Sequence, residues 1–168
     1  MATSRIAIFP GSFDPPTRGH LDIVGRASAM FDTVIVALLD NPSKTPMFSA
    51  ADRVALLKKS VSGFPNVRVE SFRGLLVEFA RARQATVVVR GVRGGADLDY
   101  ERQMADTNRH LYPEMDTVLL TPSPTVAHIS STLVRDISNL GGSVRGLVPE
   151  AVETALSTRA HAGRTQQV

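Results

Sequence analysis

Residues 6–39 read IAIFPGSFDPPTRGHLDIVGRASAMFDTVIVALL, and this stretch decides the fold. Residues 6–9 and 33–39 are short, apolar and largely β-branched, which is typical of strands buried on both faces of a sheet. Between them, apolar side chains recur at helical spacing at Leu21, Ile23, Val24, Ala27 and Phe31. The stretch therefore predicts a strand ended by Pro10 and Gly11, a loop, a helix from about Gly19, and a second strand.

The rest of the chain repeats this alternation. Further strands are expected at residues 67–72, 86–89 and 117–120, and further helices after an N-cap at Ser49 and at residues 75–83, 96–111, 131–140 and 149–156. Gly141 and Gly142 are a suitable helix stop. Strands that alternate with helices predict one α/β domain with a Rossmann-like, doubly wound parallel sheet of about five strands, covered by helices on both faces. We expect the domain to span residues 1–158 and residues 159–168 to form a disordered tail.

Composition narrows the function classes. The chain has 168 residues, of which 43% are hydrophobic and 21% charged. It has no cysteine, which excludes disulfides, thiolate metal ligands and a cysteine nucleophile. The sequence pI is about 9.8, but the formal net charge is only +3 and the basic residues are scattered, so we expect no nucleic-acid partner. No apolar run approaches bilayer length and no signal peptide is evident, so we expect a cytoplasmic protein without membrane contact.

The loop of residues 10–20 is the first candidate site. In open parallel sheets, ligands bind at the carboxyl ends of the strands, near the point where strand order reverses. Gly11 lets the backbone approach a ligand, while His20 falls at a helix start, where free N–H groups attract anions. The imidazole could donate a hydrogen bond to a phosphate oxygen. The chain lacks both G-x-x-x-x-G-K-S/T and a G-x-G-x-x-G after a strand, so the common kinase and dinucleotide hypotheses lose their main support.

Three more polar segments follow predicted strands. They are the hydroxyl-rich residues 129–135, the glycine-rich turn with Arg90 and Arg93, and residues 41–44 with Lys44. Alone, each has an ordinary alternative, namely a helix cap or a solvated surface charge. Because all of them fall at strand ends, one phosphate-binding site is the most economical interpretation.

The motifs resemble those of a known family. PGSFDP at residues 10–15 with Gly19 and His20, and ISST with a basic residue at 135, resemble the T/H-x-G-H and I-S-S-T-x-x-R signatures of the nucleotidylyltransferase superfamily. Within it, NPSK at residues 41–44, RGVR at 90–93, DYE at 99–101 and residues 104–110 resemble bacterial phosphopantetheine adenylyltransferase. The similarity covers residues 5–158. Ser12 replaces a threonine common in the family, and Leu76 replaces a methionine of some relatives.

This resemblance implies transfer of the adenylyl group of ATP to 4′-phosphopantetheine, giving dephospho-coenzyme A and pyrophosphate. It implies that His20 stabilises the transition state, together with Lys44 and Arg93. The ATP-binding residues it implies are Gly11, Ser12, His20, Gly91, Val92, Arg93, Glu101, Val126, Ala127, His128, Ile129, Ser130, Ser131 and Thr132. The residues it implies for phosphopantetheine are Ser12, Lys44, Leu76 and Arg90. It also implies a homohexamer and feedback by coenzyme A.

The chemistry is consistent with these residue types. An acceptor phosphate is already ionised at pH 7, so the reaction needs alignment and charge stabilisation rather than a base or a covalent intermediate. We expect Mg²⁺ to be held by ATP oxygens and water, with no dedicated protein metal site. Two alternatives remain open. One is another nucleotidylyltransferase, acting for example on nicotinate mononucleotide or glycerol phosphate, and the other is a non-catalytic nucleotide-binding module.

Overall fold

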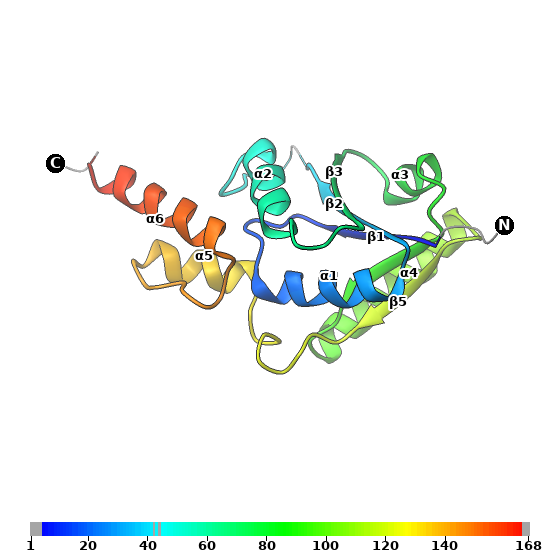
Figure 1. Cartoon of the computed structure of the whole chain (residues 1–168). Coiled ribbons are helices and arrows are strands. Elements are labelled where there is room, and N and C mark those ends of the chain that lie inside the picture. The colour runs from blue at the N-terminus through cyan, green and yellow to red at the C-terminus, as the bar shows by residue number, and fades with distance from the viewer. Residues whose placement is uncertain (1–4, 42, 44, 166–168) are drawn as a thin grey trace.

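The computed structural model describes residues 5–41, 43 and 45–165, with side chains described through residue 159. Its core is a five-stranded parallel sheet in the order β3-β2-β1-β4-β5 (Figure 1). The strands are β1 (Ile6–Gly11), β2 (Thr33–Leu39), β3 (Val67–Phe72), β4 (Val87–Gly91) and β5 (Asp116–Leu120). The helices are α1 (Arg18–Met30), α2 (Ala50–Ser60), α3 (Leu76–Ala82), α4 (Gly95–Leu111), α5 (Ser131–Asn139) and α6 (Glu150–Thr165). The predicted doubly wound α/β fold is confirmed.

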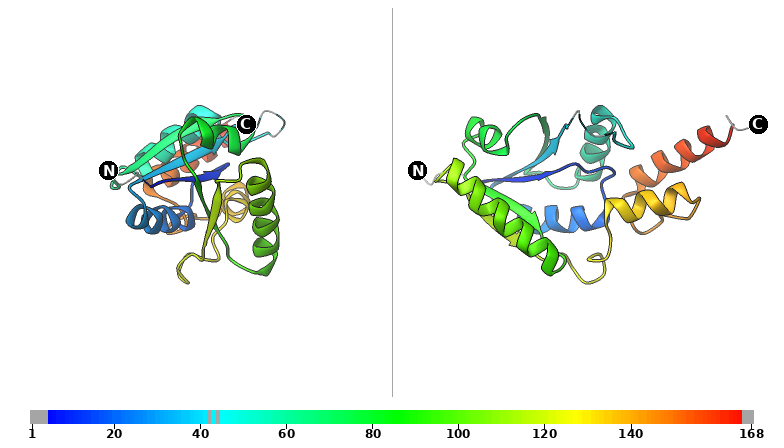
Figure 2. Two further views of the ribbon diagram at one scale, coloured as in Figure 1. Left: turned by 90° about the vertical axis from the view of Figure 1, so that its right-hand side faces the viewer. Right: turned by 180° about the vertical axis from the view of Figure 1, so that it is seen from behind.

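Helices cover the sheet on two faces, as strand alternation requires (Figure 2). On one face, α1 and α2 pack on β1 and β2 residues such as Ala7, Phe9, Val34 and Val36. On the other face, α3 and the residues that follow α4 pack on the intervening residues, among them Ile8, Ile35 and Val88. Both faces of the central strands are therefore buried, which explains their uninterrupted apolar sequences.

A third apolar cluster lies beyond the sheet, where α5 and α6 extend past the carboxyl ends of the strands (Figure 1). Ile129, Val134, Val148 and Val152 form its centre. This cluster packs the chain that follows the site-forming segment 129–135 against the rest of the domain. The cluster thus fixes the position of segment 129–135, which forms one side of the candidate site.

Most predicted boundaries agree with the structure, and three differ. β4 runs to Gly91, past the end predicted at residue 89, so Arg90 lies in the strand. β1 continues through Pro10 and Gly11, which were expected to end it. β4 pairs with β1 only at Ala7 and Ile8, so Pro10 lies beyond that ladder, where a proline is tolerated. Helix α6 extends to Thr165, past the helix end predicted at residue 156.

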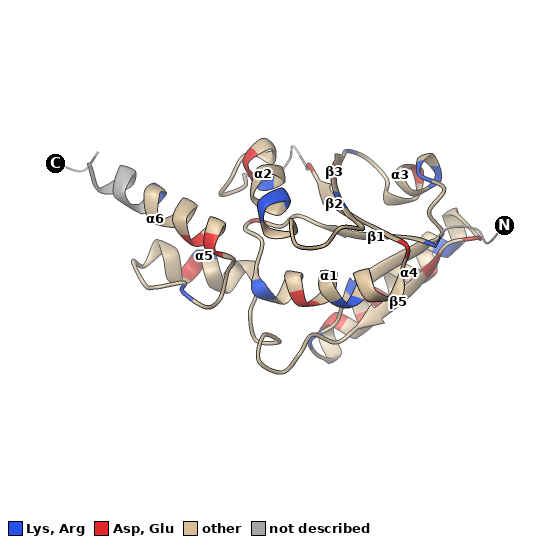
Figure 3. Ribbon diagram, viewed as in Figure 1, with Lys and Arg blue, Asp and Glu red and all other residues tan. Residues whose placement is uncertain are grey.

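Charged residues of both signs are spread over several helices and strand ends (Figure 3). Among the residues that the structure describes, no helix is both long and apolar enough to span a bilayer.

Candidate active site

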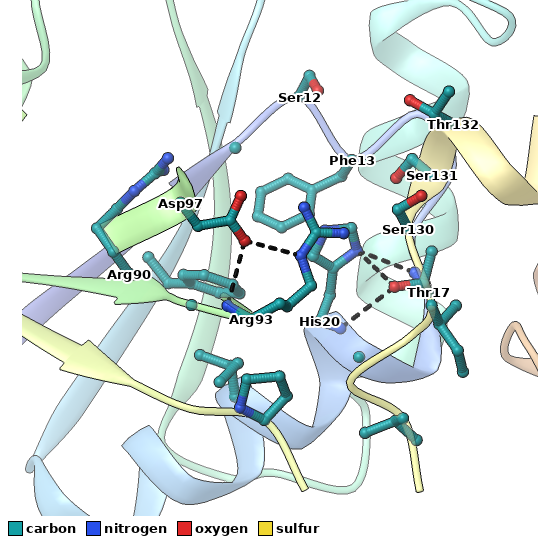
Figure 4. A pocket seen from close by; sticks show the side chains of 18 of the residues that line it. Ser12, Phe13, Thr17, His20, Arg90, Arg93, Asp97, Ser130, Ser131 and Thr132 are labelled. Carbon is teal, nitrogen blue, oxygen red and sulfur yellow. Dashed lines mark hydrogen bonds and ion pairs between the residues drawn. The ribbon is translucent and has the colours of Figure 1, made fainter. Parts of the chain in front are cut away.

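A pocket opens at the carboxyl ends of β1 and β4 (Figure 4). The chain leaves β1 toward β2 on one side and returns from β3 to β4 on the other, so these neighbours flank the topological switch point. Four parts of the chain line the pocket: residues 9–13 at the end of β1, the start of α1, residues 90–101 from β4 into α4, and residues of the stretch 122–132 that leads into α5. The two motif segments that the sequence placed in one site do lie together.

The first turn of α1 fixes the orientation of His20. Thr17 is the N-cap, and its hydroxyl accepts the backbone N–H of His20 at 3.3 Å. In return, the backbone N–H of Thr17 donates to Nδ1 of His20 at 3.0 Å, which completes a capping box with histidine in the place usual for glutamate or glutamine. Because Nδ1 accepts this hydrogen bond, the proton of the neutral ring is on Nε2.

The surroundings of His20 keep the ring neutral. Burial, together with the charges of Arg93 and Arg90, lowers the pKa of His20 to about 4. The ring packs edge-on against Phe13, with centroids 5.0 Å apart, and lies 6.3 Å from the ring of Phe9. At pH 7 the imidazole is therefore neutral, its orientation is fixed, and it can donate a hydrogen bond through Nε2–H.

Two arginines line the pocket, Arg90 at the end of β4 and Arg93 in the turn that follows, and each is paired with a carboxylate of α4. Arg90 forms a bidentate pair with Glu101 at 2.6 and 2.7 Å and also donates to the Pro10 carbonyl at 2.7 Å. Arg93 donates to Asp97 at 3.1 Å through both its backbone N–H and its Nε (Figure 4). Burial alone would raise the pKa of Asp97, but these hydrogen bonds and the charge of Arg93 lower it. The Glu101 pair is the more buried of the two, so Arg90 is held more firmly than Arg93.

The hydroxyl segment 129–135 closes the pocket from the other side. Ser130 caps α5 by accepting the backbone N–H of Leu133 at 3.1 Å. Ser131 donates to the Pro15 carbonyl at 2.8 Å, and Arg135 donates to the Asp14 carbonyl at 2.5 Å. The segment is thus bound directly to the loop after β1, which explains how two distant motifs share one site.

Similarity to known proteins agrees with this geometry. The Cytidylyltransferase-like family matches residues 8–137. The chain is 48% identical over 154 residues to the phosphopantetheine adenylyltransferase of Thioalkalivibrio sulfidiphilus, covering 92% of this chain and 97% of that protein. The chain belongs to the phosphopantetheine adenylyltransferase family. The family's enzyme from Proteus mirabilis is 47% identical over 150 residues, with 89% and 93% of the two chains covered.

A solved structure described as a nicotinate-nucleotide adenylyltransferase of Vibrio parahaemolyticus has the same fold. It superposes with a TM-score of 0.71 and covers 94% of each chain at 19% identity. At that identity the likeness concerns the fold alone.

Most residues that the family resemblance assigned to the site line the pocket: Gly11, Ser12, His20, Arg90, Gly91, Arg93, Glu101, Val126, Ile129, Ser130, Ser131 and Thr132. Val92 and Ala127 line a smaller neighbouring pocket together with Arg93. Leu76 begins α3 and packs on the apolar cluster beneath it, and His128 lines neither pocket. Lys44 lies outside the described residues. The binding roles of these last residues stay predictions.

Three supporting residues were not singled out from the sequence. Asp97 pairs with Arg93, and their i, i+4 spacing at the start of a helix could have indicated it. Buried Asp14 accepts the backbone N–H groups of Met47 and Phe48, at 2.7 and 2.9 Å. Buried Arg53 donates to the carbonyls of Ser12 and Phe48, at 2.8 and 3.1 Å. Nothing local in the sequence marks the contacts of Asp14 or the contact of Arg53 with Ser12, because these partners are more than thirty residues away along the chain.

Proposed function

We propose that the chain transfers the adenylyl group of ATP to the phosphate of 4′-phosphopantetheine, giving dephospho-coenzyme A and pyrophosphate. One observation carries the proposal: a neutral His20 presents Nε2–H in a pocket that also holds Arg90, Arg93 and the hydroxyls of residues 130–132. Membership of a family whose relatives bear this activity in their name identifies the reaction.

The reaction requires positioning more than proton transfer. An oxygen of the acceptor phosphate attacks the α-phosphorus of ATP, and the bond to the bridging oxygen breaks as pyrophosphate leaves with the electron pair. The acceptor is already an anion, so no general base is needed. Neutral His20 suits this role, because a ring that carries its proton on Nε2 can stabilise charge that develops on a phosphate oxygen.

The two arginines are suited to different tasks. Three of the five N–H groups of Arg90 are used by Glu101 and Pro10, so its fork is fixed in direction with two donors left for a phosphate. Arg93 is 44% exposed and is tied to a half-buried Asp97. An entering phosphate can compete with that weaker pair. We assign Arg90 to the fixed binding of the acceptor and Arg93 to the nucleotide phosphates, where it assists His20.

We propose that Mg²⁺ enters bound to the triphosphate oxygens. Within the described residues, no group of three or more histidine or carboxylate side chains is placed to hold a metal ion. The carboxylates that line the pocket, Asp97 and Glu101, are each engaged by an arginine. These residues do not fit a protein-held metal site, so no step above is assigned to the ion.

Assembly and regulation are proposals that come from the family resemblance. They are a homohexamer, feedback by coenzyme A at the same pocket, and a cytoplasmic location. Exposed apolar side chains on α4, namely Leu98, Tyr100, Met104 and Leu111, support an association surface. Gel filtration tests the first proposal and competition between coenzyme A and ATP tests the second.

The deciding experiment is pyrophosphate release from ATP with a panel of acceptors. Release that depends on 4′-phosphopantetheine, and not on nicotinate mononucleotide or glycerol 3-phosphate, supports the proposal. Pyrophosphate release that depends on a different acceptor would show that the chain has another nucleotidylyltransferase activity. Nucleotide binding without release for any acceptor would favour the non-catalytic module.

A further inference from the structure

The segment 121–129 runs antiparallel along one face of α1. Gly19, Asp22 and Arg26 share that face, because they are three and four residues apart on a helix. A Cβ on Gly19 would lie 3.3 Å from the carbonyl oxygen of Val126 and 3.5 Å from that of Ile129. Near the other end of the contact, Arg26 donates to the carbonyl of Thr121. The helix that carries His20 is therefore also the surface against which residues 121–129 pack.

The central contact is made by Asp22. One of its carboxylate oxygens accepts the backbone N–H of Ser123 at 2.9 Å, and the other accepts the Ser123 hydroxyl at 2.6 Å. The carbonyl of Ser123 in turn accepts the backbone N–H groups of Val126 and Ala127, at 2.9 and 3.0 Å. Asp22 thus holds the first residue of a turn whose far end, Val126 and Ile129, lines the pocket.

Neither Asp22 nor Ser123 lines the pocket itself. Both are half-buried: Asp22 lies on α1, and Ser123 lies in the connection between β5 and α5, which would otherwise be a long surface loop. The free energy of local unfolding of such a loop is low unless side-chain contacts fix it to the rest of the domain. A carboxylate that accepts two hydrogen bonds from one residue is well suited to that task.

We propose that Asp22 is a positioning residue for the nucleotide: acting through Ser123, it holds residues 123–129 in the conformation that receives ATP. This inference rests on the proposed function, which it deepens by assigning the binding of one substrate to a named support. When a loop occupies its binding-competent conformation only part of the time, apparent affinity falls in proportion to that fraction. Loss of the Asp22 contact therefore weakens ATP and leaves the acceptor largely unaffected.

The test uses Asp22→Asn, Asp22→Ala, Ser123→Ala and the double variant Asp22→Ala/Ser123→Ala. We expect Asp22→Ala to raise the ATP KM, and the Kd for ATP by calorimetry, by roughly tenfold or more, as for loss of hydrogen bonds to a charged group. Asp22→Asn keeps one acceptor oxygen and should have a smaller effect. The Kd for ATP of the double variant should be close to that of Asp22→Ala, because both changes break the same contact. The KM for phosphopantetheine should change less than twofold, on the order of the effects found at uninvolved surface sites.

Asp32→Asn is the matched control. Asp32 follows α1, accepts the backbone N–H of Arg5 at 2.8 Å, and lies at the opposite end of that helix from the pocket. Asp32, like Asp22, is a carboxylate that accepts a backbone N–H from a distant residue, and the ATP affinity of Asp32→Asn should equal that of the unaltered chain. Thermal melts of all variants monitor folding, and the milder Ser123→Ala keeps the test valid if Asp22→Ala is poorly stable.

An unchanged ATP affinity in Asp22→Ala, or equal losses for both substrates, would overturn the proposal. So would full additivity in the double variant. Calorimetry separates this outcome from failure of the proposed function. If the unaltered chain binds ATP but releases no pyrophosphate with phosphopantetheine, the function is wrong, while a selective loss of ATP binding in the Asp22 variants still supports the positioning role.

Discussion

Nδ1 of His20 accepts the backbone N–H of Thr17 over 3.0 Å, and this one hydrogen bond sets the position of the ring proton. The same bond belongs to the cap of α1, so helix formation and preparation of the imidazole are a single event. Burial and two neighbouring arginines then lower the pKa of the ring to about 4. The result is a donor prepared before any substrate enters.

His20→Ala should lower turnover by about 10²–10³, as removal of a donor to developing charge does in other enzymes. His20→Gln retains an N–H donor on a side chain of similar reach and should keep part of the activity. Pyrophosphate release at saturating substrates measures both. Near-normal turnover in His20→Ala would exclude the assigned role.

The His20 ring should titrate with a pKa near 4 by NMR, and its neutral form should show the proton on Nε2. Removing a nearby positive charge with Arg93→Ala should raise that pKa toward its ordinary value. In the unfolded chain the ring gains its proton near pH 6.5, so the free energy of unfolding should decrease as pH falls from about 6.5 toward 4. The decrease should be smaller in His20→Ala, and a ring that titrates near 6.5 in the folded chain would contradict this account.

Much of the fold and of the candidate site could be predicted from the sequence, and the parts that could not were missed for two different reasons. Strand Thr33–Leu39 and the cap at Ser49 were predicted because β-branched runs and helix caps are local signals. The site-forming loops followed from the rule that ligands bind at strand ends. The partners of Arg90 and Asp14 could not be predicted, because they depend on how distant segments pack. The length of α6 was missed because the polar residues after Leu156, among them Gly163, gave no apolar periodicity by which to extend the helix.

Arg90→Ala should raise the KM for phosphopantetheine, and it should also lower stability. It leaves the Glu101 carboxylate, which is 8% exposed, without its partner, at a cost of about 1–3 kcal/mol in the free energy of unfolding. Urea unfolding measures the second effect. The double variant Arg90→Ala/Glu101→Gln should recover part of the stability but not the KM, and recovery of both would show that Arg90 serves the fold alone.

Thr17→Val should cost about 1 kcal/mol of unfolding free energy, because valine has the shape of threonine but cannot cap α1. Thr17→Ser keeps the hydroxyl and should remain close to the unaltered chain. Denaturant unfolding of the pair checks this difference. Equal stability of the two variants would show that the capping hydroxyl contributes nothing measurable.

The seating of residues 121–129 on α1 has a mechanical consequence. Val126 and Ile129, which are proposed to hold the nucleotide, lie against Gly19, the direct neighbour of His20, which is proposed to act on its phosphates. Both groups therefore rest on the first turn of α1, and thermal motion of that helix carries them together. Small displacements of the helix relative to the sheet would then leave the alignment of ATP with His20 intact.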